Sequence, residues 1–114
     1  MSTILESAKT HFRDRMSGNL LCVDVPEWGD VKIYFKPSMN FKDQGEILKL
    51  HGDNKPAEAV VMTLIVKAMD ADGNKLFKRA NMTEMLRSID PEVVSRIVSE
   101  MSDDEPTVED AAKN

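Results

Sequence analysis

Residues 21–35, LCVDVPEWGDVKIYF, decide the fold because two alternating stretches flank a turn. Apolar residues occupy every second position on both sides of PEWGD, which predicts two strands that each have one apolar face. These apolar positions are Leu21, Val23, Val25, Val31, Ile33 and Phe35. The PEWGD segment has the composition of a turn. Because a lone hairpin is marginally stable in water, we expect its apolar face to pack on helices elsewhere in the chain.

A helix is predicted before the hairpin. Thr3 and Glu6 can form a capping box at its start, and it should end near Gly18. We expect this helix, residues 1–18, to be loosely attached to the rest of the fold. Its charged face suits either solvent or a neighbouring subunit.

Two helices are predicted directly after the hairpin. The first covers residues 40–50, with Phe41 and Leu48 on one face. The second runs from Pro56 to Met69 and is apolar on nearly all sides, so it should be the central helix. Its β-branched residues would also suit a buried strand, but the length of the run and its Pro-Ala-Glu-Ala start favour a helix.

Two more helices have start signals in the last third of the chain. Asn81 and Glu84 form a plausible capping box for one, and Asp90 precedes Pro91 at the start of the other. Their apolar positions are Met82, Met85, Leu86, Ile89, Val93, Val94, Ile97, Val98 and Met101.

The formal net charge of −5 is unevenly distributed. Five acidic residues and one lysine lie from Ser102 onward, which gives that segment −4 and leaves −1 for residues 1–101. We expect a single folded domain over residues 1–101 and a disordered acidic tail over residues 102–114. The predicted class is α+β and mostly helical: an N-terminal helix, one β-hairpin, three to four packed helices and the tail.

No stretch of the sequence is apolar enough to suggest a membrane segment. The longest apolar run covers residues 59–66, whereas about 20 residues are needed to cross a bilayer. The N-terminal segment has charges where a signal peptide needs an apolar core. We therefore expect a cytoplasmic protein without membrane contact.

The stretch MDADGNKLF, residues 69–77, resembles the opening of a calcium-binding EF-hand loop because it places side-chain oxygens at Asp70, Asp72 and Asn74. An EF-hand also needs glycine at its sixth position and a bidentate glutamate at its twelfth. Those positions hold Lys75 and Asn81 here. We therefore expect no calcium site and no cofactor.

The same stretch is better explained as a structural turn formed by Asp72, Gly73 and Asn74. Gly73 can adopt the left-handed conformation that reverses the chain, and Asp and Asn side chains hydrogen-bond locally in such turns. Leu76 and Phe77 should then return to the core.

No catalytic constellation is present in the sequence. Cys22 lies in a predicted strand, where a buried and inert cysteine is expected, and His11 and His51 have no partner at catalytic or metal-ligand spacing. The glycines occur singly and form no phosphate-binding loop. The nearly neutral body lacks the basic field that nucleic-acid binding needs. We expect a protein that is not an enzyme and does not bind nucleic acid.

Methionine is abundant in the second half of the chain. The residues concerned are Met62, Met69, Met82, Met85 and Met101. They either fill a small core or form an apolar surface that can adapt to protein partners or to a second copy of the chain. Trp28, at the predicted hairpin turn, is a candidate anchor for the same surface.

The order of elements resembles the tail assembly chaperones of long-tailed, lambda-like bacteriophages of the siphovirus type. The resemblance covers roughly residues 20–101 and rests on WGDVKIYFKP, on DADGNKLF after an apolar helix, and on NMTEMLRSIDPEVVSRIVSEM before an acidic tail. The turn and the helices after it are its most specific part.

The resemblance implies a late phage protein that binds the aggregation-prone tape-measure protein, keeps it soluble and helps to recruit tail-tube subunits. It also implies the short, non-frameshifted form of the chaperone, a homo-oligomer, and a location in the host bacterial cytoplasm but not in the mature virion. Two alternatives remain open: a small acidic protein-binding adaptor or regulator without an assembly role, and a metal-dependent module built on the Asp70 loop.

Overall fold

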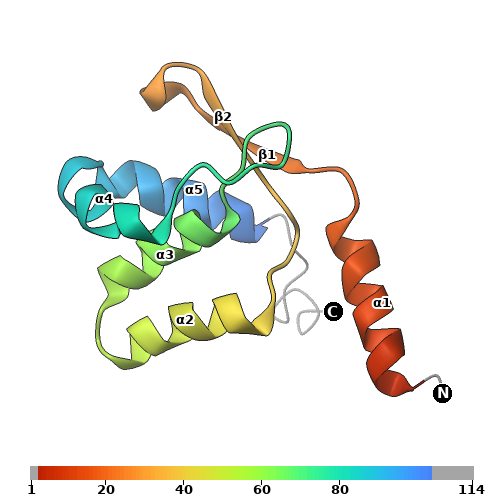
Figure 1. Ribbon diagram of the computed structural model, residues 1–114. Coiled ribbons are helices and arrows are strands. Elements are labelled where there is room, and N and C mark those ends of the chain that lie inside the picture. Colours follow the sequence, from red (N-terminus) through yellow and green to blue (C-terminus); the bar gives the residue numbers. More distant parts are fainter. Residues whose placement is uncertain (1–2, 104–114) are drawn as a thin grey trace, which may run out of the picture.

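The computed structural model describes residues 3–103 (Figure 1). The elements in chain order are α1 (Ile4–Met16), β1 (Leu21–Val25), the 3-10 turn η1 (Pro26–Trp28), β2 (Val31–Phe35), α2 (Phe41–Gly52), α3 (Pro56–Lys67), the 3-10 turn η2 (Arg79–Asn81), α4 (Met82–Ser88) and α5 (Pro91–Asp103). The predicted mostly helical α+β class with one hairpin is confirmed. Apart from the last two residues of α5, the predicted disordered tail lies outside the described residues.

Strands β1 and β2 form the predicted antiparallel hairpin. Val23 pairs with Ile33 at its centre, so the odd-numbered residues share one face. Val23, Val25, Ile33 and Phe35 on that face are buried. The same register places Cys22 on the opposite face, where it is exposed. The expectation of a buried cysteine is therefore wrong, because Cys22 alternates with the apolar positions and belongs to the outer face.

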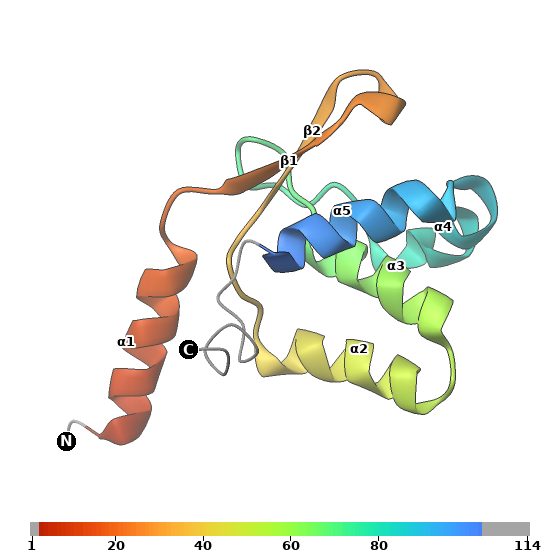
Figure 2. The ribbon, with the colours of Figure 1, turned by 180° about the vertical axis from the view of Figure 1, so that it is seen from behind.

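The core lies between the hairpin and the helices α3, α4 and α5. Helix α3 contacts α2, α4 and α5, and α5 contacts β1, so α3 is central as predicted (Figures 1 and 2). The buried core cluster consists of Val23, Val25, Ile33, Phe35, Val61, Leu64, Ile65, Ala68, Met85, Val93, Val94, Ile97 and Met101. Side chains from both halves of the sequence thus cover the apolar face of the hairpin.

The end of α3 differs from the prediction. The helix stops at Lys67 and not near Met69. The Met69 backbone instead pairs with the edge of β2: Tyr34 N donates to Met69 O at 2.9 Å, and Met69 N donates to Tyr34 O at 2.7 Å. These two hydrogen bonds satisfy backbone groups at the edge of a two-stranded sheet, which outweighs two more helical residues.

The start of α4 also differs from the prediction. Asn81 makes no side-chain hydrogen bond that caps α4, so the proposed capping box with Glu84 is wrong. The Asn81 side chain instead accepts a 2.8 Å hydrogen bond from the backbone N–H of Lys78 and closes the turn η2. The start of α5 is as predicted, because Asp90 Oδ1 accepts a 2.9 Å hydrogen bond from Glu92 N.

Helix α1 stands beside the body of the molecule (Figures 1 and 2). Thr3 Oγ1 accepts a 3.1 Å hydrogen bond from Glu6 N and caps the helix start. None of the residues of α1, all of which are described, is buried. A hydrogen bond of 3.3 Å from Arg15 Nη2 to Pro37 O joins α1 to the linker after β2.

Candidate binding surfaces

The DADGNKLF segment forms a tight turn held by one carboxylate. Asp70 Oδ1 accepts hydrogen bonds from Asp72 N at 2.9 Å and from Asn74 N at 3.0 Å. The hydrogen bond from Asn74 is the main reason why the pKa of Asp70 lies below its ordinary value. Gly73 has a φ of +86°, the left-handed conformation that the sequence indicated. The residue that organises the turn is therefore Asp70.

The residues after this turn point in different directions. Lys75 Nζ donates to the carbonyl oxygen of Val66, so its ammonium group lies against the end of α3. Phe77 packs on the core, but the Leu76 side chain is 40% exposed, contrary to the expectation that both return to the core. Within residues 3–103, no group of three or more His, Cys, Asp or Glu side chains is placed to hold a metal ion.

The structure divides the candidate methionines into two sets. Met69, Met85 and Met101 are buried and fill the core, with exposed fractions of 8%, 5% and 0%. Met62 and Met82 are half-buried. The sequence could not separate the two sets, because all five methionines lie in or next to stretches that read as apolar helices.

Trp28 ends the turn η1 at the tip of the hairpin. It is half-buried and packs on the core cluster, so only part of its ring is available to a partner. On the same side, Arg96 Nη2 of α5 lies 2.7 Å from Glu27 Oε1, and this ion pair ties the hairpin tip to the last helix.

Helix α2 carries an apolar outer face that the sequence analysis did not propose as a site. Phe41 is 90% exposed and Leu48 is 59% exposed, and they lie seven residues apart on one side of the helix. Gly45 lies between them on that face, and a Cβ added there would meet no atom within 4 Å. The contrast was available in the sequence: Ile47 and Leu50, which lie away from this face, are half-buried in the structure.

An ion-pair cluster fixes which face of α2 points inward. Arg79 Nη2 lies 2.6 Å from Glu46 Oε1 and 3.1 Å from Asp43 Oδ1. The hydrogen bond from Arg79 is the main reason why the pKa of Glu46 is below its ordinary value. Because Asp43 and Glu46 face Arg79, Phe41 and Leu48 are directed away from the body.

Helix α1 carries a second unpartnered apolar stripe. Ile4 is 90% exposed and Leu5 is 66% exposed, whereas Phe12 and Met16, further along the helix, are half-buried. Leu5, Phe12 and Met16 recur at helical spacing and share one side of α1, and Ile4 lies at the margin of that side. The C-terminal half of the stripe therefore faces the body, and the N-terminal half has no partner within residues 3–103.

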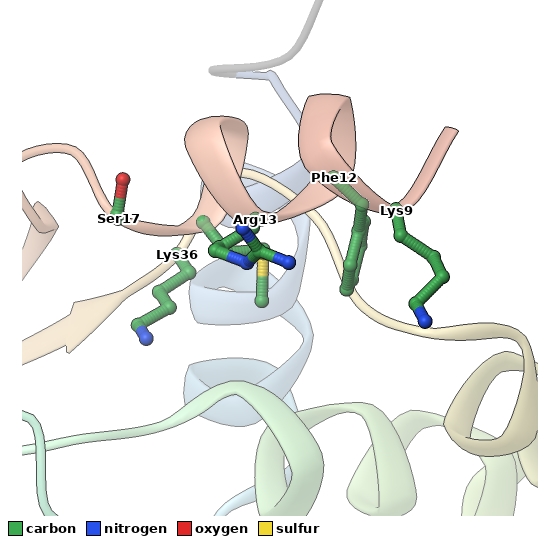
Figure 3. Close-up of a pocket in the computed structure, with 6 residues that line it drawn as sticks. Lys9, Phe12, Arg13, Ser17 and Lys36 are labelled. Atoms are coloured by element: carbon green, nitrogen blue, oxygen red, sulfur yellow. The ribbon is translucent and has the colours of Figure 1, made fainter. Parts of the chain in front are cut away.

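A groove of about 490 Å³, which we call the α1 groove, lies along this half-buried part of α1 (Figure 3). Its apolar floor is formed by Phe12 and Met16. Lys9, Arg13 and Lys36 line it as well, and Figure 3 shows the three cationic side chains along its length on both sides of Phe12. The sequence could not reveal this groove, because Lys36 comes from the linker after β2 and meets α1 only in the folded chain.

Similarity to known proteins is found at the level of the structure. No family model matches the sequence, and no curated protein matches it at a significant level. A solved structure described as "Structure of bacteriophage HK97 tail assembly chaperone" is similar with a TM-score of 0.66 and 21% identity, covering 88% of this chain and 94% of that chain. No helix within residues 3–103 is long and apolar enough to span a membrane. The resemblance drawn from the sequence is confirmed at the level of the fold: the chain has the fold of the tail assembly chaperone of bacteriophage HK97.

Proposed function

We propose that the protein is a non-enzymatic phage tail assembly chaperone that binds the tape-measure protein, keeps it soluble and helps to recruit tail-tube subunits. The observation that carries the proposal is the fold, which is similar to that of the HK97 tail assembly chaperone over 88% of the chain. In this role the protein acts in the host bacterial cytoplasm and is not part of the mature virion.

The exposed apolar faces support a role in binding aggregation-prone helices. Soluble proteins seldom leave large apolar side chains exposed together without a function. The outer face of α2, with Phe41 and Leu48 exposed, suits an amphipathic helix of the client, because helices recognise apolar surfaces through residues spaced three, four and seven apart. Met62, Met82 and Trp28 add half-buried apolar area elsewhere on the molecule.

The free half of α1 supports the proposal of a homo-oligomer. Ile4 and Leu5 are exposed on a helix that stands beside the body, so a second copy can cover them. Many weak sites repeated along an oligomer bind a long client more strongly than a single site, because each further contact is intramolecular.

Co-expression with the tape-measure protein of the same phage tests the proposal. The chaperone should raise the soluble fraction of the tape-measure protein, and the double variant Phe41→Ser/Leu48→Ser should lose most of this effect. The matched control is Gln44→Ser/Lys49→Ser, which changes two exposed polar positions of α2 and should keep it. A tape-measure protein that is equally insoluble with and without the chain would refute the proposed function.

A further inference from the structure

The α1 groove is cationic although the protein as a whole is acidic. Three cationic residues line it, and none of the described residues that line it is acidic. Glu6 Oε1, which does not line the groove, lies 3.6 Å from Lys9 Nζ. The groove therefore combines an apolar floor with a positively charged rim.

A neighbouring hollow of about 260 Å³ extends this positive region toward α3. It shares Phe12, Met16 and Lys36 with the α1 groove and adds Lys75 and one acid, Asp43. Burial is the main reason why the pKa of Lys75 is lowered. Asp43 opposes this shift, and the positive charges of Arg79 and Lys36 add to it. The cations at this end of the groove thus repel one another, which favours an anionic occupant.

Residues 104–114 of the same chain have the complementary charge. They contain Asp104, Glu105, Glu109, Asp110 and Lys113, a net charge of −3. They continue from the C-terminal end of α5, which lies on the side of the body that faces α1 in both Figure 1 and Figure 2. Eleven extended residues reach up to about 36 Å, which is enough to follow the groove.

We propose that residues 104–114 dock in the α1 groove of their own chain. Their carboxylates pair with Lys9, Arg13 and Lys36, and the Val108 side chain lies on the floor formed by Phe12 and Met16. Individual exposed ion pairs are weak, but a segment joined to its site by a short tether has an effective concentration in the millimolar range. The docked segment covers the half of the α1 stripe that faces the body, and a partner that uses that half must displace it.

Paramagnetic relaxation in the full-length chain tests this docking. The exposed Cys22 is replaced by serine, and a nitroxide is attached to Ala112→Cys. We expect the NMR signals of Phe12, Met16 and Lys36 to lose most of their intensity, compared with the same signals after the spin label has been reduced. Because the interaction is ionic, 1 M salt, where the Debye length is about 3 Å, should restore much of that intensity.

Charge reversal provides the matched comparison. Lys9→Glu/Lys36→Glu should abolish the intensity loss, and adding Glu109→Lys/Asp110→Lys should bring it back. The control Lys42→Glu/Lys49→Glu makes the same charge change on α2 and should leave the loss intact. If Lys36→Glu disturbs folding, the docking is tested by the recovery of NMR intensity in 1 M salt, measured on the protein with an unsubstituted groove.

Two results would overturn the proposal. One is broadening that is absent, or that the groove substitutions leave unchanged. The other is broadening that is lost when the doubly labelled protein is diluted with an excess of unlabelled protein, since residues 104–114 would then occupy the groove of a second copy. The experiment uses no client, so it is independent of the proposed chaperone function.

Discussion

Helices α3 and α1 are nearly equal in length, 12 and 13 residues, but they have opposite environments. Six residues of α3 are buried, whereas none of α1 is. The sequence pattern indicates this difference, because α3 is apolar on nearly all sides whereas α1 has one apolar side and a charged face. The difference lies in the surroundings: α3 is enclosed by α2, α4 and α5, while α1 meets the body along one groove. We infer that α3 stabilises the fold and that α1 is left for contacts with other molecules.

The largest expected effect is the loss of a core side chain from α3. Leu64 is fully buried, so Leu64→Ala should lower the free energy of unfolding by about 2–5 kcal/mol through lost burial and a cavity. Leu5→Ala on α1 should change it by less than about 0.5 kcal/mol, because that side chain is mostly exposed. Urea unfolding followed by circular dichroism measures both values. Equal losses would show that α1 also stabilises the fold.

Leu5→Ala should instead change self-association. If a second copy covers the free half of α1, light scattering should give a lower mass for Leu5→Ala than for the unsubstituted protein. Asp14→Asn, on another face of α1, is the control and should keep the mass.

Two glycines should respond to alanine with opposite signs. Gly73 has a φ of +86°, so Gly73→Ala should lower the free energy of unfolding by about 1–2 kcal/mol. Gly45 lies within α2 with open space around it, so Gly45→Ala should raise that free energy by up to about 1 kcal/mol. Thermal unfolding of both variants checks the signs. A loss at Gly45 would mean that α2 is packed more tightly on that side than the described residues show.

The smallest expected effect is a pH dependence at the Arg79–Glu46 pair. The folded-state pKa of Glu46 is lowered, so the pair contributes stability above the unfolded-state pKa, about 4.3 for glutamate, and loses it as the pH falls through the folded-state pKa. The advantage of the unsubstituted protein over Glu46→Gln should be below about 1 kcal/mol at pH 7, because the pair is partly exposed, and should disappear once the pH is below the lowered folded-state pKa of Glu46.

Urea midpoints from pH 7 to pH 3 measure this difference. Glu84→Gln, a change of the same type on α4, provides the control. An advantage that stays constant over the whole range would contradict the assignment to ionised Glu46.

The elements were predictable where their signals are local. The alternation of apolar residues around PEWGD predicted the hairpin, and Asp90 before Pro91 predicted the start of α5. The end of α3 was not predictable, because it depends on the pairing of Met69 with Tyr34, which lies far away in the sequence. The predicted capping box of Asn81 and Glu84 was wrong for a similar reason. The Asn81 side chain closes the turn η2, which precedes α4.

The binding surfaces were predictable in part. The sequence placed Phe41 and Leu48 on one face of α2, but not that this face is the exposed one, which depends on the contact of α2 with α3 and Arg79. The α1 groove could not, because Lys36 joins Lys9 only through tertiary structure. Burial of Met101 and partial exposure of Met62 likewise depend on neighbours that come from other elements.

The contact between α5 and the hairpin has a consequence for folding during synthesis. Arg96 reaches back 72 residues to Asp24 O, at 3.4 Å, and 69 residues to Glu27. Contacts at such separations require a large loop to close, which slows folding. The hairpin is translated early, but its apolar face cannot be covered until α5 has left the ribosome. During that interval the nascent chain exposes strands prone to aggregation, so slower translation of the α3–α5 region should lower its soluble yield.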